Sequence, residues 1–242
     1  MPGHKDLTPV PLKPLGEFAV LGPDARDIHD GFEVSQQVTA FQAFWSHDAQ
    51  VITAIDQNPN AFLAPLPEAK PGRHLRLAND LWPLAGKIVL AERIRLSTQR
   101  LVCLRLSQAV LSNTWWPVAL RDQFQNIDIE KTLALWLNST LGIFLLVANR
   151  QETEGAWMKF KKPVLSSLPV LNLGSLSDKQ LSQLSAAYDK VCQEELRPFP
   201  EMDKDPVRAR IDAAVSQALG LPDFSILRSL LAQEPVVCLK RL

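Results

Sequence analysis

The chain has 242 residues, of which 46% are hydrophobic and 21% are charged, proportions that suit a globular protein with a substantial core. Basic and acidic residues number 26 each, and the resulting formal net charge of zero argues against a simple nucleic-acid binder. Three widely spaced cysteines, Cys103, Cys192 and Cys238, form no CxxC pair, which argues against a disulfide-stapled secreted domain and predicts a cytoplasmic location.

The neutral total conceals an uneven distribution of charge. Residues 1–69 contain three basic and nine acidic side chains, whereas residues 70–105 contain eight basic and two acidic ones. The rest of the chain is balanced. A basic segment of this kind indicates an anionic partner. The alternative is that its arginines only keep a sheet edge soluble.

Residues 1–127 are expected to form a β-rich recognition portion. In order, the patterns predict a short strand at 15–23, a polar loop at 24–31, a segment at 32–45 that suits either a strand or a helix, a strand at 51–55 and an irregular, proline-rich connection at 58–72. After a central hairpin, two further strands are predicted at 109–111 and 116–120, around a turn at 112–114.

The central hairpin is the clearest prediction in this half of the chain. Its strands, Lys87–Arg95 and Arg100–Ser107, are rich in β-branched and apolar residues that partly alternate with polar ones. Four residues separate the strands, a length that suits a β-hairpin. The hairpin would present four polar side chains together near one tip, those of Arg93, Arg95, Gln99 and Arg100.

Residues 128–173 are expected to complete this portion with a core helix, a loop and a strand. Asp128 is positioned to cap the helix, and Asn138-Ser139-Thr140 interrupts its apolar sequence. The apolar run from Leu133 to Ala148 is shorter than the roughly 18 residues that a transmembrane helix needs. We therefore expect a buried helix and no membrane contact, with Asn138 and Ser139 bonded to nearby backbone.

Residues 174–242 are expected to be helical. The signals are, in order, a capping box at Ser177 and Gln180, a helix start at Asp205-Pro206, a helix end at Gly220 and a last short helix at 224–232. Strands therefore precede helices rather than alternating with them. This order predicts an α+β fold with a β-rich N-terminal half, a long buried helix and a helical C-terminal part.

No catalytic motif is present in the sequence. It contains no phosphate-binding glycine loop, no HExxH or GxSxG motif and no cluster of histidines and cysteines with metal-ligand spacing. Asp56 and the later Glu68-Ala69-Lys70 match the acidic residue and ExK motif of a metal-dependent nuclease, which remains an alternative. Such carboxylates must project from rigid strands, whereas the surrounding chain is rich in proline. We therefore predict no catalytic residue and no metal site.

Several short features occur together around the apolar helix. The stretch from Thr132 to Val170 contains Leu137-Asn138-Ser139, a loop with Gly155, and then Lys159, Leu165 and Leu168-Pro169-Val170. Further features are Pro14-Leu15-Gly16-Glu17 near the start and, downstream, Ile211-Asp212 to Val215 followed by Leu219-Gly220-Leu221. In these features the sequence resembles the C-terminal target-recognition region of adenine-modifying restriction–modification DNA methyltransferases, including restriction–methylation fusions and phage-defence methylases.

The resemblance implies a specificity module that binds double-stranded DNA and acts with a methyltransferase catalytic domain or subunit, with other defence proteins as further partners. The catalytic half of that family carries a cofactor-binding glycine motif and an Asn-Pro-Pro-Tyr/Phe motif, and neither is present here. The chain is therefore not expected to be an enzyme by itself, and S-adenosylmethionine would bind to its partner. A protein-interaction subunit without DNA contact is the alternative that the zero net charge favours.

The candidate DNA contacts follow from base chemistry. Arginine reads guanine, and glutamine or asparagine reads adenine, in the major groove, which suits the hairpin tip. Basic residues just before the hairpin are candidates for phosphate contacts, and tryptophans beside turns could stack on an unstacked base. The predicted DNA-binding residues are Arg73, Arg76, Arg93, Arg95, Gln99, Arg100, Trp116, Arg150, Trp157 and Lys159.

Overall fold

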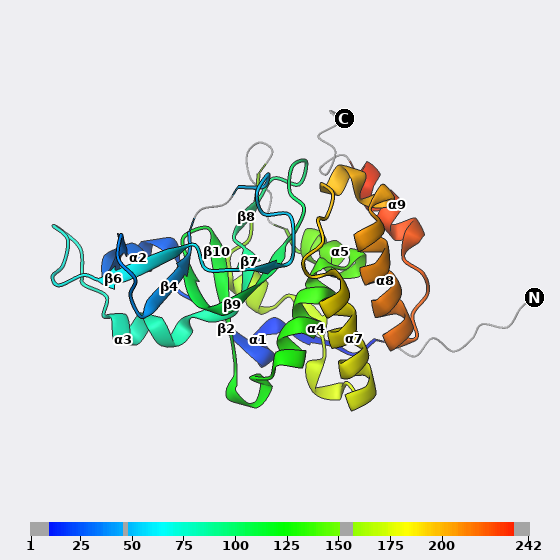
Figure 1. Ribbon diagram of the computed structural model, residues 1–242, viewed down its shortest axis with the longest axis horizontal. Helices are drawn as coiled ribbons and strands as arrows, with labels where there is room; N and C mark the ends of the chain where they lie inside the picture. The colour runs from blue at the N-terminus through cyan, green and yellow to red at the C-terminus, as the bar shows by residue number, and fades with distance from the viewer. Residues whose placement is uncertain (1–9, 46–47, 151–156, 235–242) are drawn as a thin grey trace, which may run out of the picture.

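The computed structural model describes residues 10–45, 48–150 and 157–234 and has the predicted α+β architecture (Figure 1). An eight-stranded sheet has the order β2-β10-β7-β9-β4-β6-β3, and β5 pairs with β9 beside this path. Its strands are β2 (Ala19–Leu21), β3 (Phe32–Ser35), β4 (Phe41–Phe44), β5 (Asp56–Gln57), β6 (Ala61–Pro65), β7 (Gly86–Ala91), β9 (Cys103–Ser112) and β10 (Trp115–Leu120).

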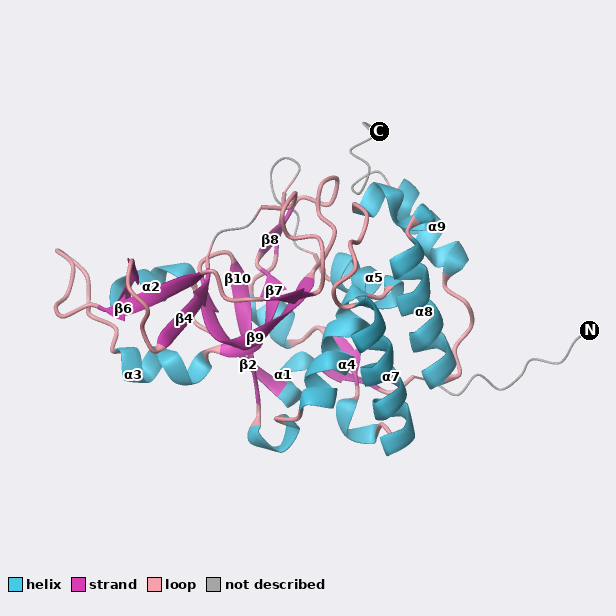
Figure 2. Cartoon of the chain, in the orientation of Figure 1, coloured by secondary structure: helices cyan, strands magenta, loops and turns pink. Residues whose placement is uncertain are grey.

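The longer helices gather at one end of the sheet, as Figure 2 shows. They are α4 (Ile127–Asn138), α5 (Thr140–Ala148), α7 (Asp178–Val191), α8 (Pro206–Leu219) and α9 (Ser225–Gln233). Shorter elements are α1 (Leu15–Phe18), α2 (Ala25–Gly31), α3 (Ala78–Leu81), α6 (Lys162–Ser166) and the 3-10 turns η1 (Trp82–Leu84), η2 (Asp122–Phe124), η3 (Leu173–Ser175) and η4 (Phe199–Lys204). Two small ribbons pair β1 (Leu12–Pro14) with β12 (Pro169–Leu171), and β8 (Arg93–Ile94) with β11 (Met158–Lys159).

The central hairpin is confirmed, but its tip differs from the prediction. Strands β7 and β9 are antiparallel, with Val89 opposite Leu104. Strand β7 ends at Ala91 and β9 begins at Cys103, so the connection is longer than four residues and contains β8. Four apolar side chains in it are buried, which draws the connection onto the core instead of into solvent; they are Ile94, Leu96, Leu101 and Val102. Farther along, the predicted strand at 109–111 is part of β9, and β10 pairs with β7 rather than with β9.

The N-terminal predictions need four corrections. Residues 24–31 are not a loop: Asp24 caps α2 by accepting a hydrogen bond from the Asp27 amide (2.9 Å), and Ile28 is buried. Residues 15–23 begin with one helical turn, α1, before β2, and 51–55 contain no strand, although Ile55 is buried. Strand β6 lies within the segment expected to be irregular, and residues 32–45, left open, form two strands.

The C-terminal helix signals are confirmed. Ser177 and Gln180 form the capping box of α7. Helix α8 follows Asp205, whose carboxylate accepts hydrogen bonds from two amides of the first turn, and it ends at Gly220 with a φ of +66°. The predicted cap of the apolar helix was wrong, because Asn126 caps α4 and Asp128 lies inside it. The Asp128 carboxylate instead accepts a hydrogen bond from the Ser185 hydroxyl.

The long apolar helix is two helices that meet at an angle of 68°. Within the described part of the chain, no single helix is long and apolar enough to cross a membrane, and only the bent pair of α4 and α5 would be so by length and composition. Ser139 makes the break, because its hydroxyl accepts a hydrogen bond from the Gly142 amide and so caps α5. Gly142 is required there, since an added Cβ would lie 2.2 Å from the Trp136 carbonyl oxygen.

Asn138 joins the end of α4 to the sheet. Its side-chain amide donates hydrogen bonds to the carbonyl oxygens of Cys103 (2.8 Å) and Ala134 (3.0 Å). Its side-chain oxygen accepts a hydrogen bond from the Val102 amide (3.1 Å). The prediction that Asn138 and Ser139 bond to backbone is thus confirmed. Backbone polar groups at the start of β9 obtain their hydrogen-bond partner from Asn138, a residue of α4.

We predict that Asn138→Leu destabilises the fold. The change leaves the buried Val102 amide and Cys103 carbonyl without their side-chain partner, so the free energy of unfolding should fall by about 2–4 kcal/mol. Urea denaturation measures this change. Asn172→Ala, which removes an exposed turn contact to the Gly174 amide, should cost less than about 1 kcal/mol. Equal losses in the two variants would contradict the role assigned to Asn138.

Candidate nucleic-acid interface

The β8–β11 ribbon brings the hairpin connection beside the loop that follows α5. Strand β8 pairs antiparallel with β11, so that Arg93 lies opposite Lys159 and Ile94 lies opposite Met158. Side chains of directly opposed residues share a face of a sheet. Ile94 and Met158 are buried, whereas Arg93 is exposed and Lys159 is partly exposed. The ribbon therefore packs one face on the core and presents two basic residues on the other.

The ribbon is attached to the main sheet through Phe160 and Trp116. The Phe160 amide donates a hydrogen bond to the Glu92 carbonyl (2.9 Å), which extends the pairing of the two strands. The indole Nε1 of Trp116 donates to the Phe160 carbonyl (3.0 Å), and Trp116 is only 6% exposed. This position corrects the expectation that Trp116 stacks on a base, because its ring supports the ribbon from inside the core.

The four side chains expected at the hairpin tip point in different directions. Gln99 is 2% exposed, and its amide donates a hydrogen bond to the Leu101 carbonyl (2.8 Å). The Arg100 guanidinium donates to the Glu195 carboxylate (2.6 Å) and to the Leu196 carbonyl (2.8 Å). Gln99 is therefore turned away from solvent and Arg100 is turned toward the helical part, which corrects the expectation of a four-residue reading tip.

Most of the positive charge of residues 70–105 is neutralised by acids. Two cases lie beside a cavity of about 320 Å³ next to α2: Arg73 pairs with Asp30 (2.6 Å), and Arg76 pairs with Asp27 (2.9 Å). The other ion pairs of this segment join Lys87 to Glu130, Arg100 to Glu195, and Arg105 to both Asp56 and Glu130. These contacts explain how a strongly basic segment can belong to a neutral protein.

The ribbon retains most of the positive charge that is left. Neither Arg93 nor Arg95 has an ion-pair partner among the described residues, and the buried Nε of Arg95 has no hydrogen-bond partner there. Lys159 lies 3.6 Å from Glu92, an acidic neighbour that the sequence did not single out. Because Glu92 immediately precedes β8, the pairing of β8 with β11 places it beside Lys159.

Two further predicted residues lie near the ends of the loop that connects α5 to β11. Trp157, immediately before β11, is 44% exposed, so its ring is available to a ligand. Arg150 is partly buried, and its guanidinium donates a hydrogen bond to the Val147 carbonyl (3.1 Å), at the end of α5. Gly155, one of the features of the resemblance, lies outside the described residues.

The nuclease alternative receives no geometric support. The Asp56 carboxylate accepts hydrogen bonds from Tyr188 (2.9 Å) and from Arg105 (3.2 Å), between α7 and the sheet. Lys70 instead donates to the His29 carbonyl (2.6 Å) at α2. No group of three or more His, Cys, Asp or Glu residues that could hold a metal ion occurs within the described ranges. Burial and the neighbouring Asp56 carboxylate raise the pKa of Tyr188, which keeps its hydroxyl a donor to Asp56.

Comparison with solved structures finds similar chains, among them one from the type IIG restriction endonuclease BpuSI. The two chains are 11% identical, and the match covers 90% of this chain and 32% of the other, with a TM-score of 0.48. This chain thus spans about a third of the length of the chain that it matches. No family model and no curated protein matches the sequence.

We predict that substitutions separate the supporting residues from the exposed ones. Trp116→Phe removes a buried hydrogen bond and Gln99→Ala removes a buried amide, so each should lower the free energy of unfolding by about 1–3 kcal/mol. Arg93→Ala and Lys159→Ala should change it by less than about 0.5 kcal/mol, because both side chains are at the surface. Thermal and urea unfolding of the four variants measure these values. A large loss with Arg93→Ala would mean that Arg93 is structural.

Proposed function

We propose that the chain is a DNA target-recognition module that acts with a methyltransferase catalytic domain or subunit in restriction–modification or phage defence. The observation that carries this proposal is the β8–β11 ribbon, where Arg93 and Arg95 have no acidic partner among the described residues and lie near Lys159 and the exposed Trp157. A cytoplasmic location follows from the same proposal.

The ribbon has the shape and chemistry to read DNA. A two-stranded β-ribbon fits into the major groove, where an arginine forms bidentate hydrogen bonds with guanine. Arg93, which is exposed on the ribbon, is the residue that we assign to base reading. Lys159 and Arg150 would neutralise phosphates, contacts that hold a protein in register. Trp157 would stack on a base that is displaced from the duplex, as the flipping of a target adenine requires.

Arg73 and Arg76 form a separate candidate contact. Figure 1 shows α2 and α3 at the end of the sheet that is remote from the helices α7 to α9. Both arginines are exposed, although each pairs with an aspartate of α2. The Arg76–Asp27 pair is exposed, and exposed ion pairs contribute little to stability, so a phosphate can replace Asp27 at small cost. Asp30 is buried, so Arg73 would meet a phosphate while it stays bonded to Asp30. We propose that these residues extend the DNA contact along the backbone.

The chemistry of methyl transfer is assigned to the partner. This assignment is supported by the absence of the family's catalytic motifs from the sequence and by the resemblance of the chain to the recognition region. S-adenosylmethionine would therefore bind to the catalytic domain or subunit, and this chain would hold and orient the DNA for it.

We expect binding to double-stranded DNA to weaken steeply as salt rises, because each neutralised phosphate releases a counterion. Changing Arg93, Arg95 and Lys159 together to alanine should lower the affinity and reduce the slope of log K against log salt by about one to two, because Lys159 is assigned to a phosphate and Arg93 to a base. Titration of a labelled duplex at several salt concentrations measures both quantities. The matched control changes Lys179, Lys190 and Lys204, three exposed lysines of the helical part, and should alter neither.

The protein-interaction alternative has one observation in its favour, which is that acids already pair with most basic residues of the segment 70–105. The same titration separates the two functions. A chain that binds no duplex at low salt, even together with a methyltransferase partner, would favour the interaction subunit. If the control variant lost as much affinity for the duplex as the ribbon variant does, the binding would be non-specific electrostatic attraction only.

A further inference from the structure

The helical part holds the connection between β7 and β9 at several points. The Phe199 amide, in η4, donates a hydrogen bond to the Gln99 carbonyl (2.9 Å). The backbone N–H of Gln99 in turn donates a hydrogen bond to the Arg95 carbonyl (3.0 Å), which closes the turn that follows β8. The Arg100 side chain binds the Glu195 carboxylate and the Leu196 carbonyl. These bonds connect the ribbon to residues that lie about a hundred positions later in the chain.

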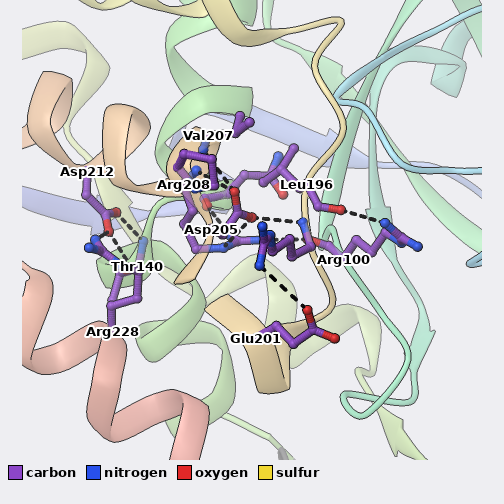
Figure 3. Close-up of polar contacts among 12 residues, drawn as sticks. Arg100, Thr140, Leu196, Glu201, Asp205, Val207, Arg208, Asp212 and Arg228 are labelled. Carbon is purple, nitrogen blue, oxygen red and sulfur yellow. Dashed lines mark hydrogen bonds and ion pairs between the residues drawn. The ribbon is translucent and has the colours of Figure 1, made fainter. Parts of the chain in front are cut away.

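Arg208, on α8, is at the centre of this attachment (Figure 3). Its side chain is fully buried. One guanidinium nitrogen, Nη2, donates a hydrogen bond to the Arg100 carbonyl (2.7 Å), and the other, Nη1, donates to the Asn138 carbonyl (2.7 Å). The guanidinium also lies 5.2 Å from the centre of the Phe199 ring, within reach of a cation–π contact. One side chain therefore touches the connection, the bend between α4 and α5, and η4.

Arg208 remains positively charged although it is buried. Burial lowers its pKa to about 10, and the nearby carboxylates of Asp205 and Asp212 oppose this shift. The group stays protonated at neutral pH, so all its bonds to carbonyl oxygens are charge-assisted and strong. The sequence carried a signal for this residue, because Arg208 occupies the same helical face as Ile211 and Val215, where a charged side chain must find partners.

A second buried arginine provides a natural comparison. Arg228, on α9, binds the Asp212 carboxylate, which also accepts hydrogen bonds from the Thr140 amide (2.8 Å) and hydroxyl (2.6 Å). Figure 3 shows this pair beside the Arg208 group. Among the bonds of the described residues, none joins Arg228 to the connection. The two arginines thus stabilise the same helices, and only Arg208 bonds to the connection.

We propose that Arg208 is a positioning residue for DNA reading: through the Arg100 carbonyl it fixes the turn 95–100 and thereby sets where Arg93 and Arg95 stand. This inference rests on the proposed function. It makes the helical C-terminal part a determinant of sequence specificity, although it contributes no DNA contact of its own in this scheme. Arg100, expected to read bases, becomes a tether whose side chain and carbonyl both bind the helical part.

The test compares Arg208→Met with Arg228→Met in the full chain, together with its partner if binding requires one. Duplexes with a randomised centre are first enriched on the wild-type protein, and the enriched duplex and a scrambled one serve as probes. Loss of one well-placed base contact corresponds to roughly tenfold in discrimination. We expect Arg208→Met to lower the ratio of the two affinities by about tenfold or more, and Arg228→Met to leave it within about twofold. The salt slope should be unchanged in both, because no phosphate contact is removed.

Hydrogen exchange provides a readout that does not depend on DNA. The backbone amide hydrogen of Gln99, which is bonded to the Arg95 carbonyl, should exchange with solvent faster in Arg208→Met than in Arg228→Met. Unfolding midpoints of both variants establish that the comparison is made on folded protein. If both variants changed the affinity ratio equally and also changed the exchange rate of the Gln99 amide equally, the inference would be overturned. A general loss of stability in the helical part would then explain both effects.

A milder pair of substitutions decides the matter if Arg208→Met does not fold. Glu195 and Glu194 are adjacent, but Glu195 accepts a hydrogen bond from Arg100, whereas Glu194 pairs with Arg210 on α8. Glu195→Gln should reduce the ratio of the affinities for the enriched and scrambled duplexes by about threefold, and Glu194→Gln should leave this ratio unchanged. Equal ratios in the two variants would contradict the role of Arg100 as a tether. If the wild-type chain enriches no sequence, the proposed function itself fails, whereas an unchanged ratio with enrichment intact removes the positioning role alone.

Discussion

The buried guanidinium of Arg208, on α8, bonds at one point to the bend after α4 and to the connection before β9. A buried charge is stable only where hydrogen bonds replace its lost hydration, and removing one partner leaves a cost of several kcal/mol. The carbonyls of Arg100 and Asn138 supply those bonds here. Because both carbonyls must face the same point, α8, the bend after α4 and the start of β9 cannot move independently of one another.

The bend itself follows from the same requirement for partners. A straight continuation of α4 would leave Asn138 and Thr140 inside an apolar interface without partners. Ending the helix instead lets the Asn138 amide bond to β9 and exposes the Thr140 amide to Asp212. The polar interruption in the apolar sequence therefore specifies where three elements join. It is scaffold rather than site, as its complete burial also requires.

Local signals in the sequence predicted local structure well. The capping box at Ser177 and the Asp205 start of α8 were correct, because each depends on residues within one helical turn. The predicted hairpin tip was wrong, because the burial of Leu96 and Gln99 depends on helices that come much later in the chain. The same holds for Trp116, whose bonding partner, Phe160, is 44 positions away. The α+β order, set by many residues, was predictable from pattern alone.

The zero net charge and the proposed binding of DNA are compatible once the pairs are located. A basic residue that is paired with an acid exerts little electrostatic attraction on a charge that lies farther away than the length of the pair. Salt reduces this residual attraction further. The pairs of Arg105 lie between the sheet and the helices, away from the ribbon. Arg93 and Arg95, without such pairs in the described chain, contribute their full charge at one place. A neutral protein with localised positive charge attracts a polyanion mainly at that surface, which favours a defined docking geometry over diffuse adhesion. If the chain is the recognition module proposed above, which places one base before a separate catalytic domain, geometry matters more than total attraction.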